Sequence, residues 1–211
     1  MPISYQSSTS RKPRARSTFR TLPLETIVAT PEDLARVFVA RVSDAACRAR
    51  TDGRALSLVV PGGSIARAFF PVLTDAAIDW RMVDLFWSDE RAVGSDHEDS
   101  NYRVANELLL SQVGHVRAHR MPAEDPDLDA AARTHERELV GVLGDPPRLD
   151  VVLLGVGPDG HVCSLFPGHP ALEEASRLVV AVTDSPKPPP RRLTLTLPAL
   201  GGAEIFIAAF G

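Results

Sequence analysis

The stretch Leu149-Asp-Val-Val-Leu-Leu-Gly-Val-Gly-Pro-Asp-Gly-His161 decides the fold. Its apolar run, residues 151–154, does not alternate with polar residues, which is typical of a strand buried on both faces of a parallel sheet. Glycines then compress the chain into a tight loop that ends at Asp159 and His161. Ligands of open α/β sheets bind beyond the carboxyl ends of such strands, so the stretch predicts a functional site as well as a strand.

Strand and helix patterns alternate along the rest of the chain. Thr30 followed by Pro31 marks a helix start, because threonine caps the N-terminus and proline fits the first helical position. The alternation predicts an α/β fold with a doubly wound, mainly parallel sheet and helices on both faces. The expected strands cover residues 24–29, 55–60, 82–87, 115–119, 151–154, 178–183, 192–197 (or a helix lead-in) and 205–210, and the expected helices cover residues 31–50, 65–73, 99–110 and 128–143.

The chain is long enough for one domain. It has 211 residues, 44% of them hydrophobic, and we expect a single core over residues 22–211. The last apolar run, residues 205–210, resembles an interior strand, which needs cover on both faces. Residues 1–21, rich in Ser, Thr, Arg and Pro, predict a disordered basic tail. Such a start also fits an organelle transit peptide, although Pro2 and Pro13 interrupt any amphipathic helix there.

Composition excludes several classes of partner. The net charge of -4 gives no electrostatic support for nucleic-acid binding, and an anionic substrate would need a locally positive pocket. The two cysteines, Cys47 and Cys163, make no disulfide framework, which favours a reducing, cytoplasmic compartment. No apolar run reaches the roughly 18 residues of a membrane span, so we expect no membrane partner.

The first candidate loop is Pro61-Gly62-Gly63-Ser64, which links a predicted strand to a helix. Glycines let backbone N–H groups approach an anion, and the helix N-terminus adds a favourable dipole. The alternative is an ordinary strand-to-helix turn in which Ser64 is the N-cap. The loop has neither the lysine of a Walker A motif nor the spacing of a dinucleotide site.

The second candidate loop is Ser88-Asp89-Glu90-Arg91, which directly follows a predicted strand. Arg91 can hold a phosphate or carboxylate through two parallel hydrogen bonds. One of the neighbouring carboxylates can fix Arg91 in place. The alternative is a solvated, charged loop with no ligand.

The third candidate, Asp159-Gly160-His161, is an acid/base centre. Histidine titrates near neutrality and can take a proton from water. Asp159 can orient the imidazole or bind a substrate hydroxyl, whereas a loop histidine can also be plain polar surface. His169 and Cys163 lie nearby in the sequence, but their spacing matches no standard zinc pattern.

The fourth candidate, Ser185-Pro186-Lys187-Pro188, holds a lysine in a stiff proline frame. Rigidity lowers the entropy lost when Lys187 binds an anion, although a surface spacer would have the same composition. Together the four loops supply one base, two cations and one anion-binding turn. This combination suits a small phosphorylated substrate that carries a group to be hydrolysed or isomerised.

The loops, in this order, resemble the 6-phosphogluconolactonase family from about Leu24 to the end of the chain. The resemblance implies a Rossmann-like fold of the sugar-phosphate isomerase and lactonase type. The matching stretches are Pro61-Gly-Gly-Ser64, Phe86-Trp-Ser-Asp-Glu-Arg91, Asp99-Ser-Asn-Tyr102, Leu154-Gly-Val-Gly-Pro-Asp-Gly-His161, Ser164-Leu-Phe-Pro167 and Ser185-Pro-Lys-Pro188.

The resemblance implies a hydrolase without metal or cofactor, acting in the oxidative pentose phosphate pathway. It would convert 6-phospho-D-glucono-1,5-lactone to 6-phospho-D-gluconate. No interface stripe stands out in the sequence, and we expect a monomer or weak dimer. His161 matches the family's general base, and we place Asp159 and Arg91 beside it as catalytic residues. The expected substrate- and phosphate-binding residues are Gly62, Gly63, Ser64, Asp89, Arg91 and Lys187.

Three departures separate this chain from the family pattern. Ile65 stands where a threonine is usual, and Val162 and Cys163 stand where small or hydroxylated residues are usual. Family members usually continue for some tens of residues beyond the strand at residues 205–210. The chain therefore resembles a member that lacks the usual C-terminal end.

Two other functions fit parts of the sequence. The related glucosamine-6-phosphate deaminase/isomerase class would carry Asp-Glu-Tyr in place of Asp89-Glu90-Arg91. It would also carry Asn-Glu-Pro-Gly in place of Leu165-Phe166-Pro167-Gly168, so both patterns favour the lactonase. A non-catalytic protein that binds a sugar phosphate is the third possibility, supported by Ile65 and the short C-terminal end. No G-x-S-x-G elbow is present, and a reactive lactone requires no serine nucleophile.

Overall fold

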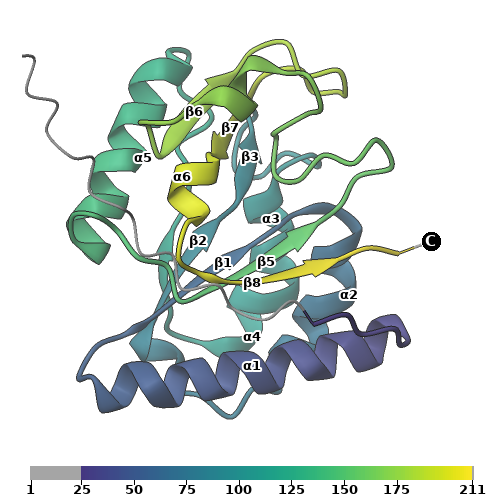
Figure 1. Cartoon of the computed structure of the whole chain (residues 1–211), viewed down its shortest axis with the longest axis vertical. Coiled ribbons are helices and arrows are strands. Elements are labelled where there is room, and N and C mark those ends of the chain that lie inside the picture. The colour runs from purple at the N-terminus through teal and green to yellow at the C-terminus, as the bar shows by residue number, and fades with distance from the viewer. Residues whose placement is uncertain (1–24, 211) are drawn as a thin grey trace, which may run out of the picture.

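A five-stranded parallel sheet forms the centre of the computed structural model, which describes residues 25–210 (Figure 1). Its order is β4-β2-β1-β5-β8, so the chain winds outward from β1 in one direction and from β5 in the other. The strands are β1 (Leu56–Val60), β2 (Val83–Trp87), β4 (Arg117–His119), β5 (Val151–Gly155) and β8 (Glu204–Ala208). The tail predicted for residues 1–21 lies outside the described residues.

Helices cover both faces of this sheet, as predicted (Figure 1). The helix starting at Thr30-Pro31 is confirmed, and the Thr30 side chain accepts a hydrogen bond from the Asp33 N–H. The α-helices are α1 (Pro31–Thr51), α2 (Gly63–Leu73), α3 (Asn101–Ala105), α4 (Ser111–Val113), α5 (Leu128–Leu143) and α6 (Leu197–Leu200). A π-helical stretch at Asn106–Leu110 joins α3 to α4, and short 3₁₀ helices cover Trp80–Met82 and Pro170–Glu173. Within the described residues, no helix is both long and apolar enough to cross a membrane.

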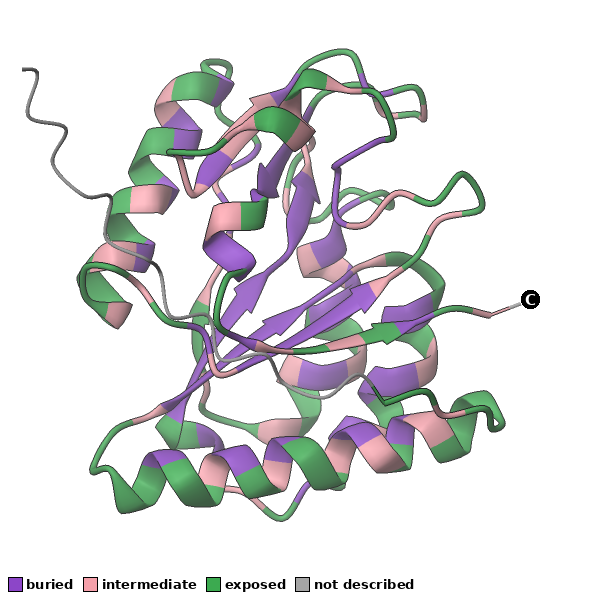
Figure 2. Cartoon of the chain, in the orientation of Figure 1, coloured by how far each residue is buried: buried purple, intermediate pink, exposed green. Residues whose placement is uncertain are grey.

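Alternate strand residues face two separate cores. Leu58 and Val60 of β1 pack with α1 and α2, whereas Val59 packs with α5 on the opposite face. The burial of every residue in β1 and β2, visible as continuous purple arrows in Figure 2, follows from this double cover. The sheet is therefore a rigid platform for the loops at its carboxyl edge.

A second, three-stranded antiparallel sheet, which the sequence did not predict, lies beside the first (Figure 1). It contains β3 (Asp89–Arg91), β7 (Arg192–Leu195) and β6 (Val179–Val182) in that order. β3 directly follows β2 and pairs with β7, so that Arg91 lies opposite Arg192. This sheet brings the proline loop before β7 to the segment that carries Asp89 and Arg91.

Two predictions about strands were wrong. Residues 25–29 form no strand, because no neighbouring strand pairs with them, and Val28 is 94% exposed. Among the described residues, the last strand, β8, pairs only with β5 and is an edge strand, not an interior one. Ile205 and Ile207 on its outer face are exposed, while Phe206 packs against Phe38 of α1.

A cluster of carboxylates and histidines joins the far edge of the sheet to α5. His119 of β4 contacts Asp84 Oδ1 at 3.0 Å and Glu138 Oε1 at 2.8 Å, and buried His135 lies 3.4 Å from Glu138 Oε2. His135 first, and then His119, holds the pKa of Glu138 at about 2, below its usual 4.5. A carboxyl whose pKa is lowered by folding stabilises the protein above its unfolded pKa and loses that effect as the pH falls.

We expect Glu138→Gln to lower the melting temperature near pH 6 by about 2 °C, since half-exposed ion pairs contribute up to about 1 kcal/mol. The difference in melting temperature between Glu138→Gln and the wild type should disappear as the pH falls from about 4.5 to about 2, because the wild-type carboxyl also becomes neutral there. Thermal unfolding followed by circular dichroism measures this. Glu98→Gln, at an exposed site, is the control; a gap for Glu138→Gln that stays constant with pH contradicts the assignment.

Candidate active site

The loops after β1 and β5 flank the point where the winding direction of the sheet reverses. β1 and β5 are adjacent and parallel, but β1 continues through α2 to β2 while β5 has β8 on its other side. A crevice at the carboxyl ends of strands that diverge in this way is where open α/β sheets bind ligands. The predicted loops at Gly62 and His161 therefore follow the two strands that border this crevice.

The loop after β5 is closed by its own backbone. The Gly157 N–H donates to the His161 carbonyl at 2.9 Å, and the Gly160 N–H donates to the Gly157 carbonyl at 2.9 Å. Gly160 has φ +87°, a left-handed conformation that favours glycine. A Cβ on Gly157 would overlap the imidazole of His161, so glycine is what lets the ring fold back over the loop.

Asp159 joins the loop histidine to the lysine of the proline loop. Its Oδ1 accepts hydrogen bonds from His161 Nδ1 at 2.6 Å and from Lys187 Nζ at 2.9 Å. These two partners, the histidine first, hold the pKa of Asp159 well below its usual range. An ionised carboxylate can only accept, so His161 carries its proton on Nδ1, and Nε2 remains available to take another proton.

Glu90 is a buried anchor that positions the start of α3. Its carboxylate accepts from the backbone N–H groups of Arg91 at 2.7 Å, Asn101 at 2.8 Å and Tyr102 at 2.8 Å. Ser100 Oγ donates to it as well, at 3.1 Å. Burial raises the pKa of Glu90, and the backbone donors oppose that shift. The solvated-loop interpretation of this segment is therefore wrong for Glu90.

Asp89 is also buried, with 6% of its surface exposed. Its carboxylate accepts from Ser164 Oγ at 2.7 Å and from Ser88 Oγ at 3.2 Å, and Asn101 Nδ2 lies 3.3 Å away. These contacts tie β3 to the segment that follows His161. Substrate binding by Asp89 stays a prediction, whereas its bonds already give it a positioning role.

Arg91 keeps donors that the protein does not use. One of its terminal nitrogens donates to the Asp99 carbonyl at 2.9 Å, while its Nε is buried and has no partner among the described residues. A buried donor without a partner costs free energy until a ligand or water accepts from it. This arrangement favours Arg91 as a residue that binds an anion.

The glycine loop after β1 begins α2 without a side-chain cap. Gly62 is the N-cap, Gly63 has φ +67°, and Ser64 lies inside the first turn, so the interpretation of Ser64 as N-cap is wrong. No acidic residue occupies the first turn, which leaves the N–H groups and the helix dipole free of a competing carboxylate. The buried Asn101 side chain fills the space where a Cβ on Gly62 would lie.

Ile65, which departs from the family pattern, has a packing role. Its side chain is buried, and its Cγ1 would lie 2.8 Å from a Cβ on Gly155 at the end of β5. The first turn of α2 thus rests directly on the strand that leads to the histidine loop.

Four residues at the site received no role from the sequence. Asn101, Ser164 and Phe166 lie inside the stretches that identify the family, but no local pattern gave their function. The Phe166 ring lies 4.6 Å from the His161 ring, centroid to centroid. Arg192 lies in a segment predicted only as a strand or helix lead-in, and its contacts depend on the unpredicted second sheet.

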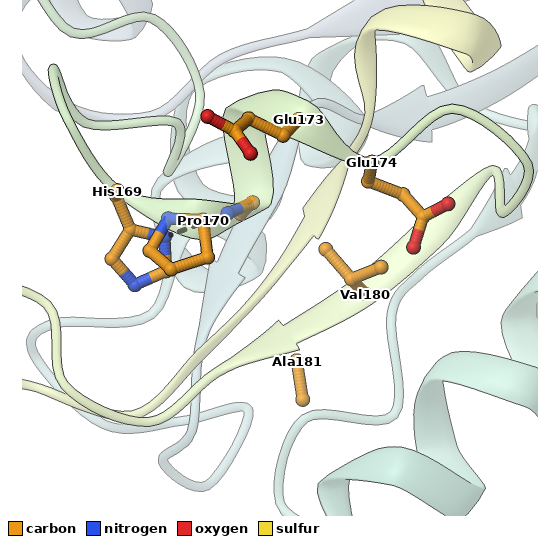
Figure 3. Close-up of a pocket in the computed structure, with 7 residues that line it drawn as sticks. His169, Pro170, Glu173, Glu174, Val180 and Ala181 are labelled. Carbon is orange, nitrogen blue, oxygen red and sulfur yellow. Dashed lines mark hydrogen bonds between the residues drawn. The ribbon is translucent and has the colours of Figure 1, made fainter.

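The hollow shown in Figure 3 is a separate feature. It has a volume of about 400 Å³ and is lined by His169, Pro170, Ala171, Glu173, Glu174, Val180 and Ala181, none of them a predicted site residue. Here His169 accepts from the Ala171 N–H and contacts Asp184 Oδ1 at 3.0 Å. Over residues 25–210, no group of three or more His, Cys, Asp or Glu side chains is arranged to hold a metal ion.

The fold and these loops define an α/β protein with a glycine-rich site of paired acidic and basic side chains at the carboxyl edge of a parallel sheet. A family model described as glucosamine-6-phosphate isomerases/6-phosphogluconolactonase matches residues 29–210. The chain belongs to this family, which confirms the resemblance seen in the loops.

Two curated proteins to which the chain is similar are named as 6-phosphogluconolactonases. The chain is 48% identical over 159 residues to the 6-phosphogluconolactonase of Mycobacterium tuberculosis, covering 70% of this chain and 64% of that protein. It is 38% identical over 188 residues to 6-phosphogluconolactonase 3, chloroplastic, of Arabidopsis thaliana, covering 81% of this chain and 56% of that protein. The matches thus span less than two thirds of the length of these curated relatives.

Solved structures confirm the α/β fold class. The 6-phosphogluconolactonase of Shewanella baltica OS155 is 32% identical with a TM-score of 0.74, over 85% of this chain and 78% of that chain. The 6-phosphogluconolactonase of Trypanosoma cruzi is 26% identical with a TM-score of 0.78, over 88% and 79% of the two chains.

We expect Gly157→Ala to remain folded but to move the imidazole of His161 away from Asp159, because the new methyl group needs the space that the ring occupies. The histidine signals in NMR spectra should shift, while the melting temperature changes little. Gly141→Ala, which adds a methyl group inside α5 where no atom lies within 4 Å, is the control. Unchanged signals from His161 in Gly157→Ala contradict the proposed packing.

Proposed function

We propose that this protein hydrolyses 6-phospho-D-glucono-1,5-lactone to 6-phospho-D-gluconate, with His161 as the general base. The pairing of His161 Nδ1 with an ionised Asp159 carries the proposal, because it leaves Nε2 as a proton acceptor, and the same Asp159 oxygen also holds the cation of Lys187. The names of the relatives support the same substrate.

The proposed reaction begins when His161 Nε2 takes a proton from a water molecule, whose oxygen then forms a bond to the lactone carbonyl carbon. Asp159 stabilises the imidazolium that results. The tetrahedral oxyanion collapses, the bond from C1 to the ring oxygen breaks, and the imidazolium returns its proton to that oxygen. The carboxylic acid formed ionises to the carboxylate. A positioned base contributes roughly 10²–10⁴-fold to such a step.

Recognition of the substrate phosphate is assigned to two elements. The free N–H groups at the start of α2, beyond Gly62 and Gly63, form an anion site of the kind common at helix N-termini. Arg91, whose Nε has no partner in the described part of the chain, adds charge-assisted hydrogen bonds. Lys187 lies on the histidine side of the crevice, where it can attract the lactone carbonyl or a hydroxyl group.

We expect His161→Ala to lower kcat by about 10²–10⁴-fold while the protein stays folded. The rate of lactone opening is measured with the spontaneous rate subtracted. His115→Ala removes an exposed histidine that precedes β4, at the opposite edge of the sheet, and should leave the rate unchanged.

Equal rates for His161→Ala and wild type would show that His161 is not the base. A wild-type rate no faster than spontaneous opening would overturn the proposed activity itself. Offering the protein glucosamine 6-phosphate tests the related class, since release of ammonia would place the chain among the deaminases.

For Arg91→Ala we expect KM to rise by about tenfold or more with a smaller change in kcat, because a charge-assisted hydrogen bond to an anion contributes about 1.5–3 kcal/mol. Initial rates over a range of lactone concentrations separate the two constants. Arg133→Ala, at an exposed site on α5, is the control. An unchanged KM with a collapsed kcat would instead place Arg91 at the oxyanion.

A further inference from the structure

Arg192 is a buried arginine whose side chain reaches the backbone of the lysine loop. It lies in β7 opposite Arg91, and only 3% of its surface is exposed. Its Nε donates to the Pro189 carbonyl at 3.0 Å. One terminal nitrogen donates to the carbonyls of Lys187 at 3.0 Å and Pro188 at 3.1 Å. The planar, forked guanidinium is suited to several acceptors at once.

The proline loop cannot satisfy these carbonyls by itself. Prolines at 186 and 188–190 have no N–H group, so the segment lacks the donors of an ordinary turn. Ser185 supplies one of the missing donors. The Lys187 N–H donates to Ser185 Oγ at 3.2 Å, and this Oγ donates to the Lys187 carbonyl at 2.9 Å. Arg192 supplies further donors, so the Lys187 carbonyl accepts hydrogen bonds from both Ser185 and Arg192.

A second set of contacts fixes Arg192 itself. Its guanidinium carbon lies 5.6 Å from the centre of the Phe166 ring, a cation–π arrangement. Its other terminal nitrogen lies 3.4 Å from Ser164 Oγ and 3.9 Å from Asp89 Oδ2. Phe166 and Ser164 follow His161 in the chain, so Arg192 packs against the segment directly after the histidine loop.

Burying this charge next to a second arginine is costly. Burial, and then the charge of Arg91, lower the pKa of Arg192. The carbonyl oxygens and the Asp89 carboxylate offset that cost, because buried charges need paired or hydrogen-bonded neighbours. Arg192 and Arg91 thus differ in kind. The donors of Arg192 are engaged by the protein, whereas the Nε of Arg91 has no partner among the described residues.

We propose that Arg192 is a positioning residue that acts through Lys187, holding its backbone so that Nζ reaches Asp159, and that it is not a ligand of the substrate anion. The effect on catalysis rests on the proposed lactonase function. The effect on Lys187 itself does not, because the contacts lie within the protein.

The kinetic test is a double-mutant cycle. Arg192→Lys keeps the positive charge but removes the forked guanidinium that bonds several carbonyls. We expect kcat/KM to fall by up to about 10²-fold, as when a side chain at a catalytic site is slightly displaced. In the Lys187→Ala background the same change should alter kcat/KM by less than about twofold, since residues that act through one another are not additive. Arg191→Lys, one position away on an exposed arginine, is the matched control.

The second test needs no activity. Lysine occurs at two positions of the chain, Lys12 and Lys187, so acetylation of Lys187 by acetic anhydride can be followed by mass spectrometry of its peptide. Freed from its ion pair with Asp159, Lys187 in Arg192→Gln should react about two- to fivefold faster, as expected for loss of a half-exposed ion pair. Asp159→Asn, which removes the partner directly, gives the reference for complete release. Cooperative melting of each variant, with Arg192→Lys as the milder change, confirms folding.

Equal effects of Arg192→Lys in both backgrounds, or a wild-type acetylation rate in folded Arg192 variants, would overturn the proposal. If the wild type does not hydrolyse the lactone, the proposed function is overturned but the positioning role is not. Faster acetylation of Lys187 in Arg192→Gln would still support the positioning role in that case.

Discussion

The buried carboxylate of Asp89 joins the segments on which the site depends. It lies in β3 and accepts from Ser164 Oγ beyond the histidine loop, while Asn101 at the start of α3 and Arg192 of β7 lie close to it. A buried carboxyl group without such partners would be strongly destabilising, so the surrounding segments have to come together for Asp89 to be buried. The position of His161 therefore depends on a group that is itself shielded from solvent.

Two aspartates have different roles at the carboxyl edge of the sheet. Asp89 holds the framework, and Asp159, which is accessible, links His161 to Lys187 through one oxygen. The two facing arginines differ in a similar way: Arg192 donates to backbone carbonyls, whereas the Nε of Arg91 has no partner within residues 25–210. Rigid, hydrogen-bonded supports behind exposed groups are what hold a catalytic geometry in place.

Much of the fold was predictable because its strands carry strong local signals. Residues 151–154 show an uninterrupted apolar run, and Thr30-Pro31 is an unambiguous helix start, so both elements appear where the sequence placed them. The second sheet was missed because β3 is short and consists of charged residues, whose strand conformation comes only from pairing with β7. The edge position of β8 was missed because apolar composition does not reveal how many neighbours a strand has.

At the candidate site, too, the sequence predicted local features but not long-range contacts. Asp159, His161 and Lys187 were predicted one by one from loop chemistry, and the structure brings them into direct contact. The placement of Ser64, by contrast, depended on where α2 begins, and the helix begins two residues earlier than a serine cap requires. The role of Arg192 rests on carbonyls of another loop, a long-range contact that residue types alone do not encode.

A crystal structure with 6-phospho-D-gluconate bound would test the placement of the substrate in this site. We expect the phosphate at the N-terminus of α2 beside Arg91, with the C1 carboxylate within hydrogen-bonding distance of His161 Nε2 and near Lys187 Nζ. A product molecule seated away from the crevice between β1 and β5, or one whose phosphate lies against His161, would contradict it.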